Sequence, residues 1–422
     1  MRITPKLCLP VLLMIASIAR AQSTEPTSAP AEPPPKTWID PDTGHRVHRL
    51  SDEPNSVGFY FNLNAYTPDG KEMVYSAPDG IHVLNLQSLQ SRLLVSGKCR
   101  TVAVSKKTPT IFFIKSDTRE LCAADINSTH VRVITTLPPR MSIASINADE
   151  TLGAGTLVEG DAPDYGDNRV LPPGMTGPLV QPLNKAKMME ERLASKQPMV
   201  LFTLDLKTGE KKDLIHSTDW INHLLFSPTD PTLLMYCHEG PWHKVDRIWN
   251  IRTDGTDNHL VHKRTMNMEI AGHEFWGIDG KTIWYDLQTP KGEDFWLAGY
   301  DLATGVRRQF HMQRDEWSIH FNVTDDESLF CGDGGDHGQV AKATDGKWIE
   351  LFRPEMIKDT GSLGDGLIQP GAFHSEHLVN MEKHNYRLEP NVRFSPDKKM
   401  VIFSGNMFGP SYVFGVEVEK GK

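Results

Sequence analysis

One pattern recurs along most of the chain: a short apolar run, a turn built from residues such as Ser, Thr, Pro, Asp and Gly, and a second apolar run. Most copies are followed by a third run that ends in an Asp-x-x-x-Gly turn, as in LFTLDLKTGEKK. A repeat of about 40–50 residues with three or four strands is typical of a β-propeller. The clear copies lie at 62–77, 145–158, 223–237, 275–287, 321–333 and 392–405, and a weaker copy lies at 101–115. The sequence therefore predicts an all-β fold, a seven-bladed β-propeller.

The regions outside the repeats set the predicted domain organisation. Residues 1–21 combine a positive start, an apolar stretch and an Ala-Arg-Ala end, which is the pattern of a secretory signal peptide. Residues 22–37 form a Pro-rich linker, and 38–422 form the propeller, with insertions at 159–198 and 354–388. The segment HRVHRL at 45–50 resembles the fourth strands, so it is expected to complete the last blade from the N-terminal side and to leave no free edge.

Composition excludes some classes of function. The formal net charge is −9, and no cluster of Lys and Arg interleaved with aromatics occurs, so the chain is not expected to bind nucleic acid. No stretch after residue 21 is long and apolar enough for a membrane span. The chain is therefore expected to be periplasmic or secreted, as a monomer or a weak oligomer. Export permits a disulfide between Cys99 and Cys122, and buried free thiols are the alternative.

Several polar residues stand where the innermost strands begin, and innermost strands line the channel of a propeller. They are Asn64, His223, His273, His320, Glu389 and Asn391, and His238 is expected at the rim. A single histidine is more often structural, but several that converge on one channel could form a metal or acid–base site. Arg247 could bind an anionic substrate or pair with a neighbouring acid. Trp242 could stack on a sugar ring.

Two stretches narrow the choice. MYCHEGPWHKVDRIW at 235–249 and HEFW at 273–276 resemble the oligogalacturonate lyases, polysaccharide lyase family 22, and the turns are shared by TolB-like propellers. The resemblance implies metal-assisted β-elimination of short pectin-derived uronic-acid oligosaccharides, with a divalent metal, typically Mn²⁺. His273 inherits the role of a metal ligand. The family's Gln-x-x-His-x-His run aligns with 386–391, so Glu389 and Asn391 stand at its two His positions. Tyr386 stands at its Gln position, and His384 could supply the ligand that the Gln provides.

The chemistry of elimination suggests roles for the other candidates. A base must remove the C5 proton of the uronate, and His223 is the first choice, with His238 second. Arg247 would hold a second uronate, and Glu239 and Glu274 would orient histidines. Trp242, Asn64 and His320 are expected to contact substrate. The position of the family's substrate-binding Arg is occupied by Thr203 in this chain.

Two alternatives remain open on the sequence. One is a non-catalytic TolB-like propeller that binds a protein or a glycan, and the other is a lyase on a different uronate oligosaccharide. Bound metal distinguishes the first alternative from the lyase, because a binding scaffold does not need His273, Glu389 and Asn391 to converge.

Overall fold

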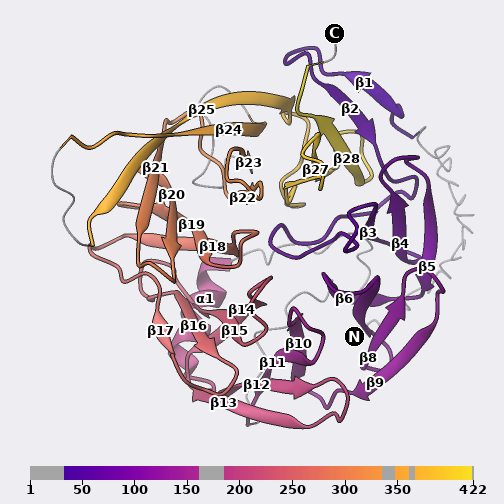
Figure 1. Ribbon diagram of the computed structural model, residues 1–422, viewed down its shortest axis with the longest axis vertical. Helices are drawn as coiled ribbons and strands as arrows, with labels where there is room; N and C mark the ends of the chain where they lie inside the picture. The colour runs from indigo at the N-terminus through magenta and orange to yellow at the C-terminus, as the bar shows by residue number, and fades with distance from the viewer. Residues whose placement is uncertain (1–32, 161–184, 335–346, 361–365, 421–422) are drawn as a thin grey trace, which may run out of the picture. The chain divides into compact units, whose positions relative to one another are not determined.

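The computed structural model describes residues 33–160, 185–334, 347–360 and 366–420. The chain separates into two units, 1–33 and 34–422, and the predicted signal peptide lies outside the described residues. Within the second unit, the described residues form six β-sheets and one helix, α1 (Lys185–Ser195). The sheets stand around a common centre in chain order, as Figure 1 shows. The prediction of an all-β fold is confirmed.

Four sheets follow one another along the first part of this unit. Each is a simple antiparallel meander, because short turns allow each strand to pair with the one that follows it. The first has three strands, β3 (Glu72–Ala77), β4 (Gly80–Asn85) and β5 (Ser91–Ser96). The next two are β6 (Cys99–Val104), β7 (Thr110–Lys115), β8 (Glu120–Asp125) and β9 (Val131–Thr136), then β10 (Met141–Ile146), β11 (Leu152–Val158), β12 (Met199–Asp205) and β13 (Lys211–Ser217). The fourth is β14 (Trp220–Phe226), β15 (Leu233–Glu239), β16 (Ile248–Arg252) and β17 (His259–Leu260).

The fifth sheet has eight strands in the order β18-β19-β20-β21-β25-β24-β23-β22. Its first half is β18 (Ile270–Trp276), β19 (Thr282–Gln288), β20 (Phe295–Asp301) and β21 (Arg307–Met312). Its second half is β22 (His320–Val323), β23 (Phe330–Asp333), β24 (Trp348–Met356) and β25 (Ile368–Asn380). The halves join where β25 runs parallel to β21, from the pair Arg307↔Ile368 to His311↔Ala372. Much of 354–388, predicted as an insertion, is therefore strand.

The last sheet joins the two ends of the second unit. Its strands are β26 (Arg393–Phe394), β27 (Met400–Gly405) and β28 (Tyr412–Glu417), followed by β2 (Arg46–Arg49) and β1 (Thr37–Ile39). Val47 of β2 pairs with Val416 of β28. The predicted closure by the segment 45–50 is confirmed, and it gives β28 a partner on the side that would otherwise be a free edge.

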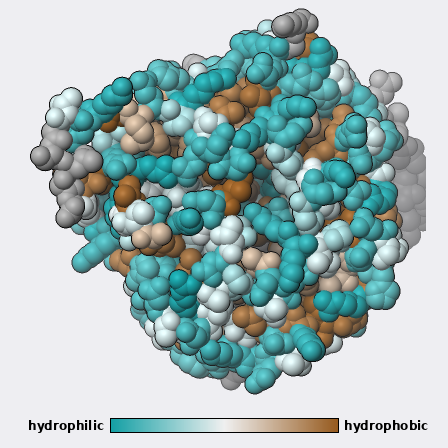
Figure 2. Space-filling view, viewed as in Figure 1, coloured by the Kyte–Doolittle hydropathy of each residue, from teal (hydrophilic) through white to brown (hydrophobic). Residues whose placement is uncertain are grey.

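The hydrophobic core lies between neighbouring sheets. One buried cluster, for example, joins Leu201 of β12 to Ile221 of β14 and Leu234 of β15. Helix α1 lies within the predicted insertion 159–198, and its buried Met189 packs against Trp220. Hydrophilic residues cover most of the face seen in Figure 2, with apolar residues visible between them.

Two smaller findings concern the cysteines and membrane-spanning helices. Cys99 and Cys122 are free thiols, as are the other two described cysteines. The structure therefore has no disulfide between Cys99 and Cys122. Among the described residues, no helix has the length and the apolar character that crossing a bilayer requires.

Candidate functional site

Four polar residues occupy the same position in four successive repeats. His223, His273 and His320 each lie three residues before the end of an inner strand, in β14, β18 and β22, and Asn391 lies two residues before the start of β26. Equivalent positions on strands arranged around one centre face the same space. The sequence prediction that these residues converge therefore has a simple basis in the repeat.

Local backbone distortion directs three of these side chains. His223, His273 and Asn391 have φ angles of 48°, 47° and 57°, in the left-handed region that residues other than glycine rarely adopt. At both histidines the strand register also shifts, between Asn222 and Leu225 in β14 and between Gly272 and Phe275 in β18. Bulges re-aim side chains, and such strain of about 1–3 kcal/mol is typical of functional positions.

Two imidazoles are held by carboxylates and point to each other. His273 Nδ1 lies 2.7 Å from Asp286 Oδ1, and His320 Nδ1 lies 2.9 Å from Asp333 Oδ2. The two rings meet edge to face with centroids 5.0 Å apart. Gly272 permits the first pair, because a Cβ at this position would stand 3.1 Å from Asp286 Oδ1. A carboxylate on Nδ1 leaves Nε2 of each ring available, as in histidines that bind metals.

A carboxylate lies beside the second of these imidazoles. His320 Nε2 is buried without a hydrogen-bond partner and lies 3.8 Å from Glu389 Oε2. Burial opposes a charge on His320, but Asp333 and Glu389 outweigh it and raise the pKa of this histidine. A buried polar atom without a partner costs about 1–3 kcal/mol, and a cation beside it would remove that cost. Two imidazoles and one carboxylate suit a divalent transition metal.

A second cluster surrounds His223. Its Nε2 lies 3.1 Å from Glu239 Oε2, and the other oxygen of Glu239 accepts a hydrogen bond of 2.7 Å from Arg247. The same guanidinium donates to Glu274 through Nε at 2.9 Å and Nη2 at 3.4 Å. Burial alone would raise the pKa of Glu239, but Arg247 and His223 hold it well below its usual range. Glu239 is therefore an anion that fixes the orientation of His223.

His223, Cys237 and Glu239 also have the spacing of a metal trio, with their donor atoms within 4.8 Å of one another. The contacts argue against a cation there. Arg247 already neutralises Glu239, and burial raises the pKa of Cys237 well above its usual value, which keeps the thiol protonated. A histidine that is oriented by a carboxylate and keeps one nitrogen available is instead suited to accept a proton.

The sequence prediction named Asn64 but missed the aromatic residues 59–61, which lie in the same segment before β3. Figure 1 shows this segment reaching toward the centre. Arg393 of β26 donates to the backbone oxygens of Phe59, Tyr60 and Leu63. The Tyr60 ring lies with its centroid 5.9 Å from that of His223 and 5.6 Å from that of His320. Burial and the nearby Glu389 raise the pKa of Tyr60 well above its usual value. The aromatic run GFYF at 58–61 was the available signal.

Two predicted catalytic residues take different places. His238 follows Cys237 and precedes Glu239 in β15, so its side chain points to the opposite face of the sheet from theirs. Its ring packs on Trp249, with centroids 4.9 Å apart, and burial lowers its pKa. Arg247 is 4 % exposed and bound to two carboxylates, so it positions Glu239 and does not reach a substrate.

Two predicted metal ligands are engaged elsewhere. His384 is buried, with Nε2 2.8 Å from the Leu388 oxygen and Nδ1 3.3 Å from the Asn406 nitrogen. Asn391 accepts a hydrogen bond from the Phe61 nitrogen and donates to the Glu389 oxygen. The structure therefore assigns both to supporting the chain around the site.

The predicted substrate contacts also differ. Asn64 Nδ2 donates to the backbone oxygens of Tyr66 and Val104 at 2.9 Å each, which ties two neighbouring sheets together. Trp242 packs against helix α1, with Lys185 Nζ 5.2 Å from its ring centroid. His320 belongs with His273 and Glu389. Thr203, at the position of the family's Arg, is buried in β12.

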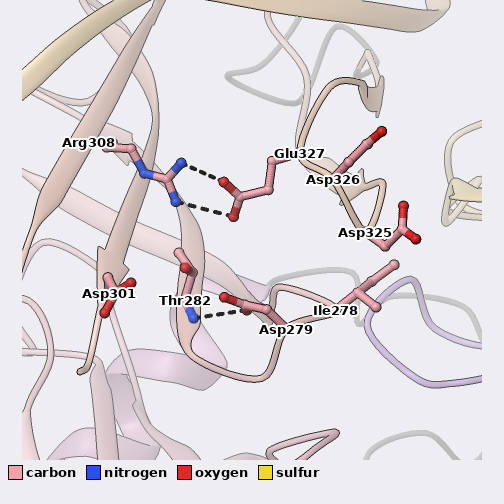
Figure 3. A pocket seen from close by; sticks show the side chains of 8 residues that line it. All are labelled: Ile278, Asp279, Thr282, Asp301, Arg308, Asp325, Asp326 and Glu327. Atoms are coloured by element: carbon pink, nitrogen blue, oxygen red, sulfur yellow. Dashed lines mark hydrogen bonds and ion pairs between the residues drawn. The ribbon is translucent and has the colours of Figure 1, made fainter. Parts of the chain in front are cut away.

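A separate hollow lies at the β18–β19 and β22–β23 turns (Figure 3). Arg308 there makes a bidentate pair with Glu327, and four more carboxylates line the hollow, those of Asp279, Asp301, Asp325 and Asp326. Lys398, outside the lining, pairs with Asp325 and Asp326. An excess of negative charge repels an anionic ligand, so this hollow is not part of the candidate site.

Comparison with known proteins identifies the family. The sequence model of the oligogalacturonate lyases matches residues 35–421. The chain belongs to the oligogalacturonate lyase family. It is 25 % identical over 392 residues to an oligogalacturonide lyase of Pectobacterium atrosepticum, which covers 90 % of this chain and 95 % of the relative. It is 24 % identical over the same length to an oligogalacturonate lyase of Dickeya dadantii, with the same two coverages.

Solved oligogalacturonate lyases share the fold. One, determined in complex with manganese, superposes with a TM-score of 0.71 at 23 % identity and covers 91 % of this chain and 96 % of its own. Another, from Vibrio parahaemolyticus, gives a TM-score of 0.72 at 21 % identity with the same coverages. The family resemblance seen in CHEGPW and HEFW is thus confirmed, and it extends over most of the chain.

Proposed function

We propose that this protein is a metal-dependent lyase that cleaves short oligogalacturonates by β-elimination. The observation that carries the proposal is the convergence of two groups on one centre. His223, held by Glu239, stands on one side, and His273, His320 and Glu389 stand on the other, with Tyr60 between them. A member of this family needs both a proton acceptor and an anchor for the uronate carboxylate.

His223 removes the C5 proton of the uronate. Glu239 accepts a hydrogen bond from Nε2–H of the imidazole, so Nδ1 carries the lone pair that takes the proton. As the proton arrives, the imidazolium is stabilised by the anionic Glu239, which stays ionised beside Arg247. Glu274 completes the charge balance, because one guanidinium serves two carboxylates.

His273, His320 and Glu389 would hold the metal. When bound, a divalent cation supplies positive charge to the uronate carboxylate, which makes the C5 proton more acidic. Asp286 and Asp333 fix the two imidazoles so that each presents Nε2. Manganese is the proposed ion, since a related lyase has been determined in complex with manganese and this donor set includes the carboxylate that Mn²⁺ favours.

We also propose seven blades, export and weak or absent self-association. The eight-stranded sheet contains two repeats, which start at β18 and β22, and counting them separately beside the five other sheets gives seven. The pattern of residues 1–21 supports export to the periplasm or beyond. The hydrophilic face in Figure 2 supports a monomer or a weak oligomer.

The test is cleavage of digalacturonate and trigalacturonate by the purified protein, followed by the ultraviolet absorbance of the unsaturated product. Activity with Mn²⁺ that a chelator abolishes and Mn²⁺ restores is the expected result. Bound metal without cleavage of these substrates would point to another uronate oligosaccharide. A protein that retains no metal and cleaves neither substrate would be the binding propeller that the sequence left as an alternative.

A further inference from the structure

Tyr60 lies within the site, and several hydrogen bonds hold its segment there. Arg393 binds the backbone oxygen of Tyr60 at 2.9 Å and those of Phe59 and Leu63 on either side. Asn62 donates to the Glu274 oxygen at 3.1 Å. A buried arginine devoted to three carbonyl oxygens fixes a loop that has no sheet partners of its own.

The hydroxyl of Tyr60 differs from those of four other tyrosines in its hydrogen bonding. Tyr66, Tyr75, Tyr236 and Tyr285 each place the phenol within 3.0 Å of a protein partner, respectively Phe394, Glu53, Asn258 and His262. The Tyr60 hydroxyl makes no hydrogen bond with any described residue. Because its ring lies beside those of His223 and His320, this hydroxyl is available to a ligand bound at the site.

We propose that Tyr60 is the proton donor to the departing oxygen in the elimination. This inference rests on the proposed function and adds a second catalytic residue to it. The ring of Tyr60 neighbours the rings of both His223 and His320, with centroids 5.9 Å and 5.6 Å away. It therefore adjoins both the proton acceptor and the anchor of the uronate carboxylate, close to the bond that breaks.

Stereochemistry requires two separate groups. In a galacturonate ring the C5 hydrogen and the C4 oxygen lie on opposite faces of the C4–C5 bond, so one side chain cannot serve both. His223 Nδ1 takes the C5 proton, the electron pair of that bond forms the C4=C5 double bond, and the C4–O4 bond breaks. The phenol proton passes to O4, which becomes the anomeric hydroxyl of the leaving sugar, and water returns a proton to the phenolate while His223 releases its own to water.

The test compares Tyr60→Phe with the wild type on two substrates. One is digalacturonate, and the other is a uronate with a 4-nitrophenyl ether at C4, whose phenolate leaves without a proton. We expect Tyr60→Phe to lower kcat on digalacturonate by about 10²–10⁴-fold with little change in KM, and to be nearly as fast as the wild type on the aryl ether. His223→Ala should be slow on both.

Two controls protect the interpretation. Tyr66→Phe removes a phenol that is hydrogen-bonded to Phe394 away from the site and should keep kcat within a few-fold. The Mn²⁺ content of Tyr60→Phe should equal that of the wild type. Full activity of Tyr60→Phe on digalacturonate, or an equal loss on both substrates, would overturn the role of Tyr60. A wild type that cleaves neither substrate would overturn the proposed function, and the role with it.

Discussion

His223 Nε2 lies 3.1 Å from Glu239 Oε2, and this contact decides which nitrogen of the histidine can act. With Nε2 as the donor, Nδ1 is the only acceptor of the ring. Arg247 keeps the carboxylate in place from its other oxygen, at 2.7 Å. The orientation of the base is thus fixed by two buried charges rather than by the histidine itself.

Replacing His223 by alanine should lower kcat on digalacturonate by about 10²–10⁴-fold, the usual contribution of a general base, without loss of bound metal. The measurements are initial rates and metal content of the purified variant. His238→Asn is the matched control, since His238 points away from the site, and it should stay within a few-fold of the wild type. Equal losses in both variants would contradict the assignment.

Replacing His320 by alanine should abolish retention of Mn²⁺, because it removes one of two imidazole donors. Asp333→Asn should weaken metal affinity by about 10–100-fold, since it disturbs only the partner that orients His320. Titration calorimetry with Mn²⁺ on the metal-free protein measures both. His374→Asn, which removes an exposed pair with Glu355, should leave the affinity unchanged. Normal affinity in His320→Ala would exclude His320 as a ligand.

Replacing Arg247 by methionine should lower the free energy of unfolding by about 3–5 kcal/mol, because two buried carboxylates lose the guanidinium that pairs with both. Urea unfolding measures the change. Arg353→Met breaks a pair with Glu376 in which the arginine is half exposed, and it should cost about 0–1 kcal/mol. A similar small cost at Arg247 would mean that Glu239 and Glu274 find other partners.

Stability should depend on Glu239 in acid. Because its pKa in the folded protein is held well below the usual value of about 4.3, the unfolded chain binds a proton more readily. This contribution is therefore fully present above about pH 4.3 and is lost as the pH falls below that value toward the folded pKa. Glu239→Gln should be less stable at neutral pH but should lose less stability across that acid window. Parallel curves of urea midpoint against pH would contradict this prediction.

The repeat made the fold readable from the sequence. Turn residues at regular spacing predicted the all-β architecture, and the likeness of 45–50 to the fourth strands predicted the pairing of β2 with β28. The same regularity located His223, His273 and His320, because equivalent positions in successive repeats share one centre.

Other features depend on contacts between residues far apart in the sequence. Pairing of Arg247 with a neighbouring acid was one of the two sequence hypotheses, but nothing local to Arg247 shows that Glu274 binds it as well. Nothing near Asn391 shows that its amide accepts a hydrogen bond from Phe61. The segment 354–388 read as an insertion because β25 is long and pairs with two strands, one of them parallel, outside the repeat pattern. Tyr60 was missed because it lies before the first clear repeat.

The order of the eight-stranded sheet has a mechanical consequence. β18 and β22 are its two edges, yet His273 on one edge meets His320 on the other. A metal held by both residues would cross-link the two edge strands, which are otherwise connected only through the hydrogen-bonded strands between them. Removing the ion would then break the link between the two edge strands, β18 and β22, and loosen the eight-stranded sheet. The separate sheet that carries His223 would keep its shape.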